Sequence, residues 1–330
     1  MVVKSNLLIN CLGLLLIAFN AVADDHSAAD WQQLGRLLFE DQTLSLDGQL
    51  ACASCHLTTY AMADPRARPE GRNGVLITRN APSLLGLRQH QPLFWDGRRE
   101  HLSQAVLDPF FSDHEQALSP AELVERVAAG YAAEFGGTVV SVESIAQAIV
   151  AYLQALPSVT SAFDQWRRSP ESITINPGAK LGYELFTGRA GCADCHLIAA
   201  TAAALSDDQF HNHKVGTRYL QGNWQALLLR VSQMDDKALK AAMLSEPAVA
   251  ALGRYLVTGA PKDIGAFRTP SLRNVMRTAP YMHDGSMASI EAVIERELYY
   301  SAADHGASFR QPERQALIEF LILLNDEKTP

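Results

Sequence analysis

The sequence contains Cys52-Ala53-Ser54-Cys55-His56 and, further along the chain, Cys192-Ala193-Asp194-Cys195-His196. Each is a C-x-x-C-H string, the attachment pattern for a c-type haem. Two thiols at this spacing reach two vinyl groups on one porphyrin edge, and the next residue places a ring nitrogen on the iron. A zinc site would need four gathered ligands, and a redox cysteine pair would need no adjacent histidine. The sequence therefore predicts two covalently bound haem c groups, held by Cys52, Cys55, Cys192 and Cys195 and ligated by His56 and His196.

The N-terminus has the features of a secretory signal peptide. Lys4 precedes an apolar run from Leu7 to Phe19, and Ala21-Val22-Ala23 is a small-residue cleavage site. The apolar run is too short to favour a membrane span, and no later stretch is apolar enough for one. We therefore expect residues 1–23 to be removed and the mature protein to be periplasmic, with no membrane span left.

The cysteine count and the charge narrow the class of protein. Of five cysteines, Cys11 lies in the expected signal peptide, and the other four belong to the haem motifs. None is left for a structural disulfide, which in an oxidising compartment fits thiols consumed as thioethers. The formal net charge of −8 argues against nucleic acid as a partner.

Apolar periodicity predicts a mainly α fold. Helices are expected over Asp30–Phe39 with Asp30 as N-cap, from the capping box at Ser119 to about Gly130, and over Val142–Leu156, Lys237–Leu256 and Pro312–Leu324. The stretch from Ser158 to Pro177 lacks this period, and its prolines predict a linker between two domains.

The two halves of the chain also echo one another. Leu181-Gly182 precedes the second haem motif as Leu34-Gly35 precedes the first, and Pro270-Ser271-Leu272 matches Pro82-Ser83-Leu84. This internal repeat predicts two cytochrome c-like haem domains related by duplication. The predicted boundaries are 1–23 for the signal peptide, 24–160 for the N-terminal haem domain and 161–330 for the C-terminal haem domain.

Several strings, taken in order, resemble the bacterial di-haem cytochrome c peroxidase and MauG family. They are Leu34-Gly35-Arg36-Leu37-Leu38-Phe39, the two haem motifs, Arg79-Asn80-Ala81-Pro82-Ser83-Leu84, Phe94-Trp95-Asp96-Gly97-Arg98, Phe267-Arg268-Thr269-Pro270-Ser271-Leu272-Arg273-Asn274 and Ala279-Pro280-Tyr281-Met282-His283-Asp284-Gly285. The resemblance implies that the N-terminal haem on His56 is peroxidatic and meets hydrogen peroxide. It also implies that the C-terminal haem on His196 transfers electrons.

The resemblance implies roles for side chains at the first haem. Gln104 and Glu115 match the family's distal pair, which moves a proton between the two oxygen atoms of peroxide. The match to Glu115 requires one extra residue between the two, so Asp113 and His114 remain alternatives. Trp95 matches the tryptophan between the haems, whose ring relays electrons.

The resemblance further implies one calcium ion. Asn80 matches the family's calcium-binding asparagine, and the carbonyl groups of Thr278 and Pro280, with waters, complete the expected shell. Oxygen ligands on irregular backbone suit this ion. The alternative is an ordinary turn without an ion.

Two departures from the cytochrome c peroxidases favour the MauG-like branch. The chain has no histidine between His56 and His90, so the loop from Met62 to Gly74 has none to cap the first iron, and we expect that iron to be open. At the second haem, Glu297 stands where the peroxidases have a ligating methionine and MauG a tyrosine. Other candidates for this ligand remain, namely Tyr299, Tyr300, Met282 and Met287.

The hypothesis that follows is a MauG-like enzyme, with the MbnH-like type as a variant. Peroxide would oxidise the paired haems to high-valent iron, and an aromatic residue of a protein partner would be oxidised in turn. The alternative is a cytochrome c peroxidase that detoxifies hydrogen peroxide with electrons from a small redox protein. A third hypothesis is a di-haem cytochrome that only transfers electrons and does not react with peroxide.

Overall fold

The structure, a computed structural model, describes residues 27–157, 160–198, 204–222, 224–305 and 308–326. The expected signal peptide, residues 1–23, lies outside the described residues. Over the described ranges, no helix combines the length and the apolar character that a membrane crossing requires.

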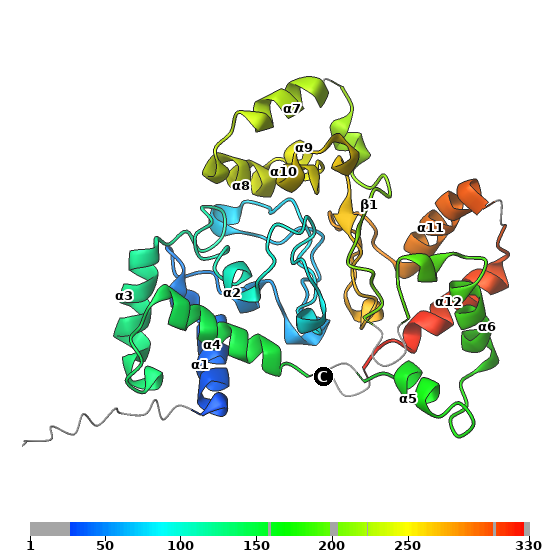
Figure 1. Cartoon of the computed structure of the whole chain (residues 1–330), viewed down its shortest axis with the longest axis horizontal. Helices are drawn as coiled ribbons and strands as arrows, with labels where there is room; N and C mark the ends of the chain where they lie inside the picture. The colour runs from blue at the N-terminus through cyan, green and yellow to red at the C-terminus, as the bar shows by residue number, and fades with distance from the viewer. Residues whose placement is uncertain (1–26, 158–159, 199–203, 223, 306–307, 327–330) are drawn as a thin grey trace, which may run out of the picture.

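The mainly α fold expected from the sequence is confirmed. The helices are α1 (Ala28–Glu40), α2 (Leu102–Ala105), α3 (Pro120–Tyr131), α4 (Val142–Ala155), α5 (Ala162–Arg168), α6 (Pro177–Thr187), α7 (Trp224–Ser232), α8 (Asp236–Ser245), α9 (Pro247–Ala250), α10 (Tyr255–Thr258), α11 (Ile290–His305) and α12 (Gln311–Ile322). Strands β1 (Phe210–His211) and β2 (Phe267–Arg268) pair antiparallel. Figure 1 shows two helical halves, with α7–α10 as a third group above them.

In the N-terminal half, α1 packs closely against α4. A Cβ atom on Gly35 would lie 1.9 Å from the carbonyl oxygen of Ala148, so only glycine allows this approach. The core around this contact is apolar and buried, and includes Leu34, Leu38, Phe110, Leu123, Ile145 and Ile149.

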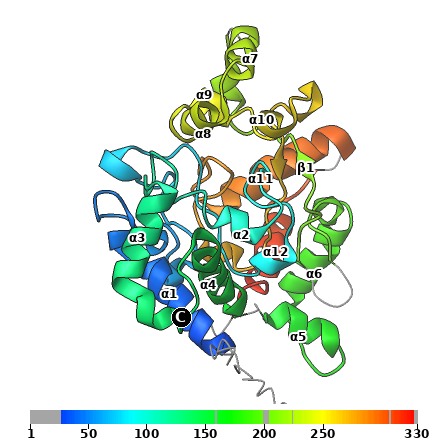
Figure 2. The same ribbon diagram turned by 60° about the vertical axis from the view of Figure 1, so that its left-hand side comes forward.

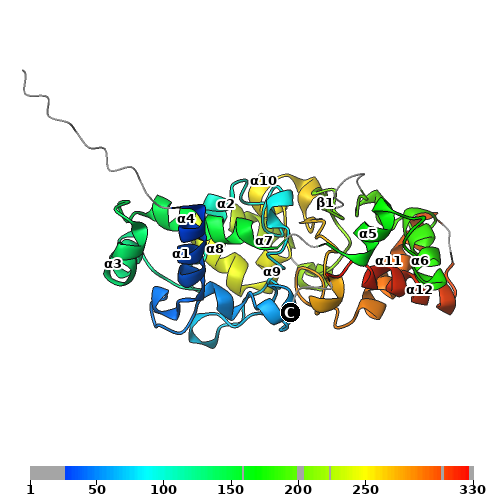
Figure 3. The same ribbon diagram turned by 90° about the horizontal axis from the view of Figure 1, so that it is seen from below.

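The C-terminal half repeats this arrangement with α6 and α12. A Cβ atom on Gly182 would lie 1.9 Å from the carbonyl oxygen of Ala316, as at Gly35. Its core includes Phe163, Phe186, Leu205, Leu317 and Phe320. The two helix pairs lie toward opposite ends of the molecule (Figure 3), and their matching glycines explain the Leu-Gly echo in the sequence.

A third apolar cluster lies under α7–α10, the group at the top of Figure 2. Val231, Met243 and Val249 of this group pack with Ile77 from the N-terminal half. A buried ion pair lies nearby, where Nη1 of Arg79 is 2.6 Å from Oδ2 of Asp96. Nη2 of Arg79 donates to the carbonyl oxygen of Ala250, so this guanidinium ties α9 to the N-terminal loops.

Helix ends and breaks show where the sequence expectations were right and wrong. Ser119 caps α3 with Pro120 in the first turn, as predicted. The N-cap of α1 is Ser27 and not Asp30, which sits three residues inside and completes a capping box. The hydroxyl oxygen of Ser27 accepts a hydrogen bond from the backbone N–H of Asp30. The carboxylate of Asp30 accepts in return from the backbone N–H of Ser27, which completes the capping box.

Two predictions about longer segments were also wrong. The single helix predicted over 237–256 is divided into α8, α9 and α10, because Pro247 has no N–H for a continuing helix and instead opens α9. The predicted linker over 158–177 contains α5, which begins at a capping box formed by Ser161 and Asp164. The boundary between residues 160 and 161 stays a prediction.

Candidate haem sites

The first haem motif is a single 3-10 turn, Cys52–Ser54, that presents His56 on its C-terminal side. The backbone N–H of His56 donates to the carbonyl oxygen of Cys52 at 3.1 Å. Nδ1 of His56 donates to the carbonyl oxygen of Met62 at 3.0 Å. This hydrogen bond fixes the ring and leaves Nε2 free for a metal, as metal-ligating histidines require.

The second motif has the same geometry. Its turn, Cys192–Asp194, follows Gly191, whose φ of 69° suits glycine. The backbone N–H of His196 donates to the carbonyl oxygen of Cys192 at 2.9 Å, and Nδ1 donates to the carbonyl oxygen of Leu205 at 2.9 Å.

The residues present fit haem c at both motifs. The four cysteines are free thiols and not disulfides, and burial raises the pKa of Cys52 and Cys192 to about 12. Burial also lowers the pKa of His56 and His196, which favours the neutral imidazole that binds metals. Each motif borders the apolar core of its own half.

Glu115 faces the first motif, whereas the contacts described for the two alternatives, Asp113 and His114, are with other segments. The charge of Glu115 raises the pKa of both Cys52 and Cys55. Burial raises the pKa of Glu115 itself, although Arg98 and Ser112 act in the opposite direction.

Asp113 and His114 make other contacts. Asp113 is exposed and lies 3.2 Å from Nζ of Lys237 on α8, and the backbone oxygen of His114 accepts from the N–H of Arg72. Gln104 is exposed on α2, and among the described residues no hydrogen bond joins it to Glu115. The structure therefore brings Glu115 to the motif and leaves the predicted pair unjoined.

Trp95 lies where the two halves meet. Its Nε1 donates to the carbonyl oxygen of Asn80 at 2.9 Å, and its own carbonyl oxygen accepts from the N–H of Arg268 on β2 at 2.8 Å. The indole of Trp95 is thus held by the N-terminal half, and its backbone is held by the C-terminal half.

The expected calcium ligands lie on neighbouring loops. The N–H of Asn80 donates to the carbonyl oxygen of His283 at 2.9 Å, which brings Asn80 beside the loop that contains Thr278 and Pro280. The side-chain amide of Asn80 donates to the carbonyl oxygen of Arg66 at 3.3 Å. Among the described contacts, none joins Asn80 to Thr278 or Pro280, so the ion stays a prediction.

Glu297 on α11 points toward the second motif, and both of its oxygens are hydrogen-bonded. Oε2 lies 2.7 Å from Nδ1 of His213, and Oε1 lies 2.6 Å from Nη1 of Arg296. Its charge raises the pKa of Cys192. Burial alone would raise the pKa of Glu297, but His213 and Arg296 lower it overall.

The other candidate ligands lie less favourably. The side chain of Tyr299 is 71% exposed, and the ring of Tyr300 packs under the guanidinium of Arg296. Met282 and Met287 belong to the loop before α11, where Tyr281 pairs with Met287.

Sequence reasoning missed His213. The sequence offers one indication, because His211 and His213 follow the second motif closely. His211 belongs to a group with Cys195 and Asp207 whose ligand atoms lie within 4.8 Å of one another. Since Cys195 is a haem thiol by its motif, we assign this group to the surroundings of the second haem and not to a separate metal.

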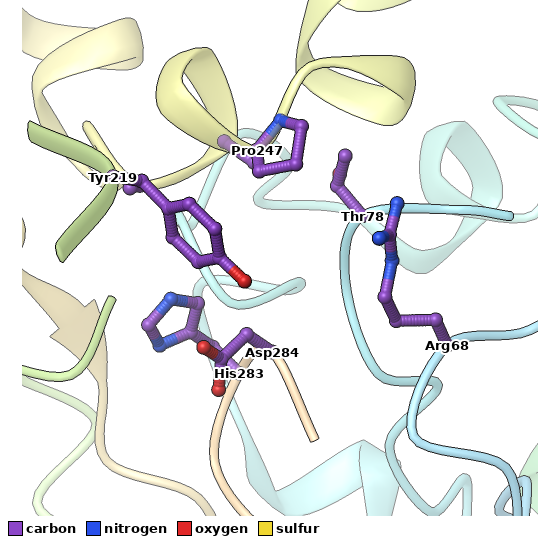
Figure 4. A pocket seen from close by; sticks show the side chains of 8 residues that line it. Arg68, Thr78, Tyr219, Pro247, His283 and Asp284 are labelled. Carbon is purple, nitrogen blue, oxygen red and sulfur yellow. The ribbon is translucent and has the colours of Figure 1, made fainter. Parts of the chain in front are cut away.

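A small pocket lies between the loops of the two halves and α9 (Figure 4). His283 lines it and stacks on Phe267 with ring centroids 3.5 Å apart. Burial lowers the pKa of His283 to about 3, so its ring is neutral at physiological pH. Oδ2 of Asp284 is buried there without a hydrogen-bond partner among the described residues, and Nη2 of Arg218 lies 3.7 Å away.

Comparisons with known proteins agree with this geometry. The family model described as di-haem cytochrome c peroxidase matches residues 29–172. Methylamine utilization protein MauG of Methylorubrum extorquens is 32% identical over 308 residues, which span 89% of this chain and 78% of that protein. Cytochrome c551 peroxidase of Nitrosomonas europaea is 28% identical, over 91% of this chain and 81% of that protein. The crystal structure of a MauG-like protein associated with microbial copper homeostasis has a TM-score of 0.72 and 29% identity, covering 93% of this chain and 92% of that one.

Proposed function

The chain belongs to the di-haem cytochrome c peroxidase and MauG family, and on that premise we propose a MauG-like enzyme that reacts with hydrogen peroxide and oxidises an aromatic residue of a protein partner. It is a haem oxidoreductase, and its family carries two haems. When bound, the haems supply the reaction with peroxide and hold the oxidising equivalents. The N-terminal domain, 24–160, would be peroxidatic, and the C-terminal domain, 161–330, would transfer electrons.

The choice of the MauG-like branch rests on one observation. The loop over 62–74 contains no histidine, so it has no imidazole to close the peroxide site. A site that stays open needs no prior reduction before it reacts, and the protein then accumulates oxidising equivalents for a partner. The likeness to a MauG-like protein associated with copper homeostasis supports a copper-handling protein as that partner.

Glu115 is the group proposed to move the proton of peroxide. A carboxylate whose pKa is raised by burial takes up a proton at higher pH than an exposed glutamate does. It is therefore suited to accept the proton from one peroxide oxygen and return it to the other, with the amide of Gln104 as hydrogen-bond donor. Trp95, whose indole donates to Asn80 and whose backbone oxygen accepts from Arg268, is proposed to relay electrons between the halves.

We also propose that the protein is periplasmic and binds one calcium ion through Asn80 and the carbonyl groups of Thr278 and Pro280. The signal-peptide features in the N-terminal sequence support the location. The hydrogen bond between the N–H of Asn80 and the oxygen of His283 supports the ion site, because it brings the two ligand-bearing loops together.

A detoxifying peroxidase is the second candidate function. Ala190 and Gly191 precede the second motif, so the surface tryptophan that MauG has there is absent, and oxidising equivalents would need another exit to a partner. The peroxidases among the similar proteins, such as that of Nitrosomonas europaea, also favour this candidate.

Stoichiometric peroxide separates the two candidates. One equivalent is added to the purified, oxidised holoprotein, and the absorbance spectrum is followed with and without reduced cytochrome c. The MauG-like function predicts an oxidised spectrum that persists for minutes and decays faster with the true partner, whose mass then rises by added oxygen or falls by lost hydrogen. Fast, sustained oxidation of reduced cytochrome c without a long-lived spectrum would instead establish the peroxidase.

A further inference from the structure

We propose that His213 supplies the second haem's ligand opposite His196, and that Glu297 is the carboxylate partner that fixes the His213 ring. The proposal rests on the assignment of a haem to the second motif. It does not depend on the reaction with peroxide or on the identity of any partner.

His213 is brought to the second motif by the sheet. It follows β1, whose Phe210 pairs with Arg268 and whose His211 pairs with Phe267. The guanidinium of Arg296 on α11 also donates to the backbone oxygen of His213. The segment is therefore anchored on both sides, by β2 and by α11.

The ring of His213 has one nitrogen bonded to a carboxylate and lies beside the second motif. Nδ1 lies 2.7 Å from Oε2 of Glu297. The ring centroids of His211 and His213 are 6.2 Å apart, and the ligand atoms of His211 and Cys195 lie within 4.8 Å of one another. Since Nδ1 faces Glu297, Nε2 is the nitrogen that would bind the iron.

Glu297 is the poorer ligand because its oxygens are already engaged. Oε1 is bonded to Arg296 and Oε2 to His213, so an iron bound through either oxygen would compete with one of these hydrogen bonds. A histidine whose far nitrogen is bonded to a carboxylate is the usual arrangement of a metal-binding imidazole, because the carboxylate fixes the tautomer and raises the basicity of the ring.

The neighbouring side chains do not offer the same arrangement. Nε2 of His211 is bonded to Oδ2 of Asp207 at 2.7 Å, so its outer nitrogen is occupied. Tyr299 is 71% exposed, whereas the side chain of His213 is 48% exposed. The ring of Tyr300 packs against the cations of Arg296 and Lys214.

Two imidazole ligands have a consequence for the electron-transfer haem. Methionine ligation raises the ferric/ferrous potential, and two nitrogen donors, one of them made more basic by a carboxylate, lower it. The second haem would then be harder to reduce than in the methionine-ligated peroxidases. This fits a site that gives up electrons during oxidation.

The test uses electron paramagnetic resonance of the oxidised holoprotein and of single variants. Wild type should show a low-spin second haem, and hyperfine spectra should resolve two imidazole nitrogen ligands on it. His213→Ala should lose the low-spin signal, and added imidazole should restore it. Glu297→Gln should keep the low-spin signal, with a higher reduction potential. The matched control His211→Gln should leave the low-spin signal unchanged.

Two results would overturn the proposal. One is a His213→Ala protein that keeps the wild-type low-spin signal, above all if Glu297→Gln loses it. The other needs no variant and holds even where His213→Ala fails to fold: hyperfine spectra of wild type that show a single imidazole on the low-spin iron. No peroxide is added in these measurements. The spectra therefore test the ligand of the second haem whether or not the protein oxidises a partner.

Discussion

Nε1 of Trp95 donates a hydrogen bond across 2.9 Å to the backbone oxygen of Asn80. Asn80 is the expected calcium ligand, and its side chain reaches the carbonyl oxygen of Arg66. The proposed electron relay and the proposed ion site therefore share one residue. A change at either residue should therefore affect the other, because the half-buried indole N–H is destabilised when it loses its acceptor.

Replacing Trp95 by phenylalanine removes both the N–H donor and the more easily oxidised ring. We expect the long-lived oxidised spectrum that follows peroxide to decay at least about tenfold faster, a change of about 1.4 kcal/mol in the barrier. Rapid-mixing absorbance spectroscopy measures this decay. The control Trp224→Phe alters a 45% exposed tryptophan on α7 and should decay like wild type. Equal decay rates in both variants would show that Trp95 relays nothing.

Asn80→Ala should abolish calcium binding. The native holoprotein is expected to contain one calcium ion per chain by elemental mass spectrometry, and the variant none, because the side-chain oxygen cannot be replaced by a methyl group. Dialysis against a chelator should produce the same loss in wild type. Native protein that is free of calcium after purification in calcium-containing buffer would remove the ion from the account.

Glu115→Gln should slow the reaction with peroxide by about 100-fold or more, the usual contribution of a positioned acid–base group. Because burial raises the pKa of Glu115, the carboxylate is protonated up to a higher pH than an ordinary glutamate. The wild-type rate should thus be retained above that raised pKa and fall as the pH drops through it, a step that the variant should lack.

The matched control for Glu115 is Asp113→Asn. Asp113 is exposed and paired with Lys237, so its replacement should leave both the rate and the pH step intact. Stopped-flow measurements over a pH series compare the three proteins. Loss of the rate in Asp113→Asn with retention in Glu115→Gln would transfer the role to Asp113.

Gly35→Ala and Gly182→Ala should each destabilise the protein by about 1–3 kcal/mol, the usual cost of overpacking a close helix contact. At both positions the new Cβ would lie 1.9 Å from a backbone oxygen. Gly130→Ala on α3 is the control, because nothing lies within 4 Å of its Cβ position, and it should be neutral or stabilising. Denaturant unfolding compares the three, and equal stability of all would contradict the close packing.

Local patterns predicted much of this molecule. The haem motifs, the Ser119 capping box and the Leu-Gly echo are short strings whose geometry is set within one or two turns, and the structure contains the elements that they predict. The break at Pro247 was visible in the sequence, but the apolar period across 237–256 outweighed it in the prediction. The capping box at Ser161 was equally visible within the expected linker.

Contacts between distant residues were harder to predict. His213 and Glu297 are 84 positions apart, and no periodicity relates them, so the sequence indicated Glu297 and its alternatives but not His213. The sequence likewise left the distal carboxylate open among Asp113, His114 and Glu115. The match to Glu115 requires one extra residue after Gln104, and such an insertion shifts the alignment by one position. The structure distinguishes the candidates by exposure, because Glu115 is half-buried while Asp113 is exposed, and the role of Glu115 stays a prediction.

The central claim is an asymmetry between the two sites, with an open iron at His56 and a fully ligated iron at His196. The most direct measurement is the spin state of the resting, oxidised holoprotein by electron paramagnetic resonance. The account predicts high-spin and low-spin signals in equal amounts, the high-spin one assigned to the first haem by its loss in a His56 variant. Two low-spin haems at rest would contradict it, because peroxide would then have no iron to reach.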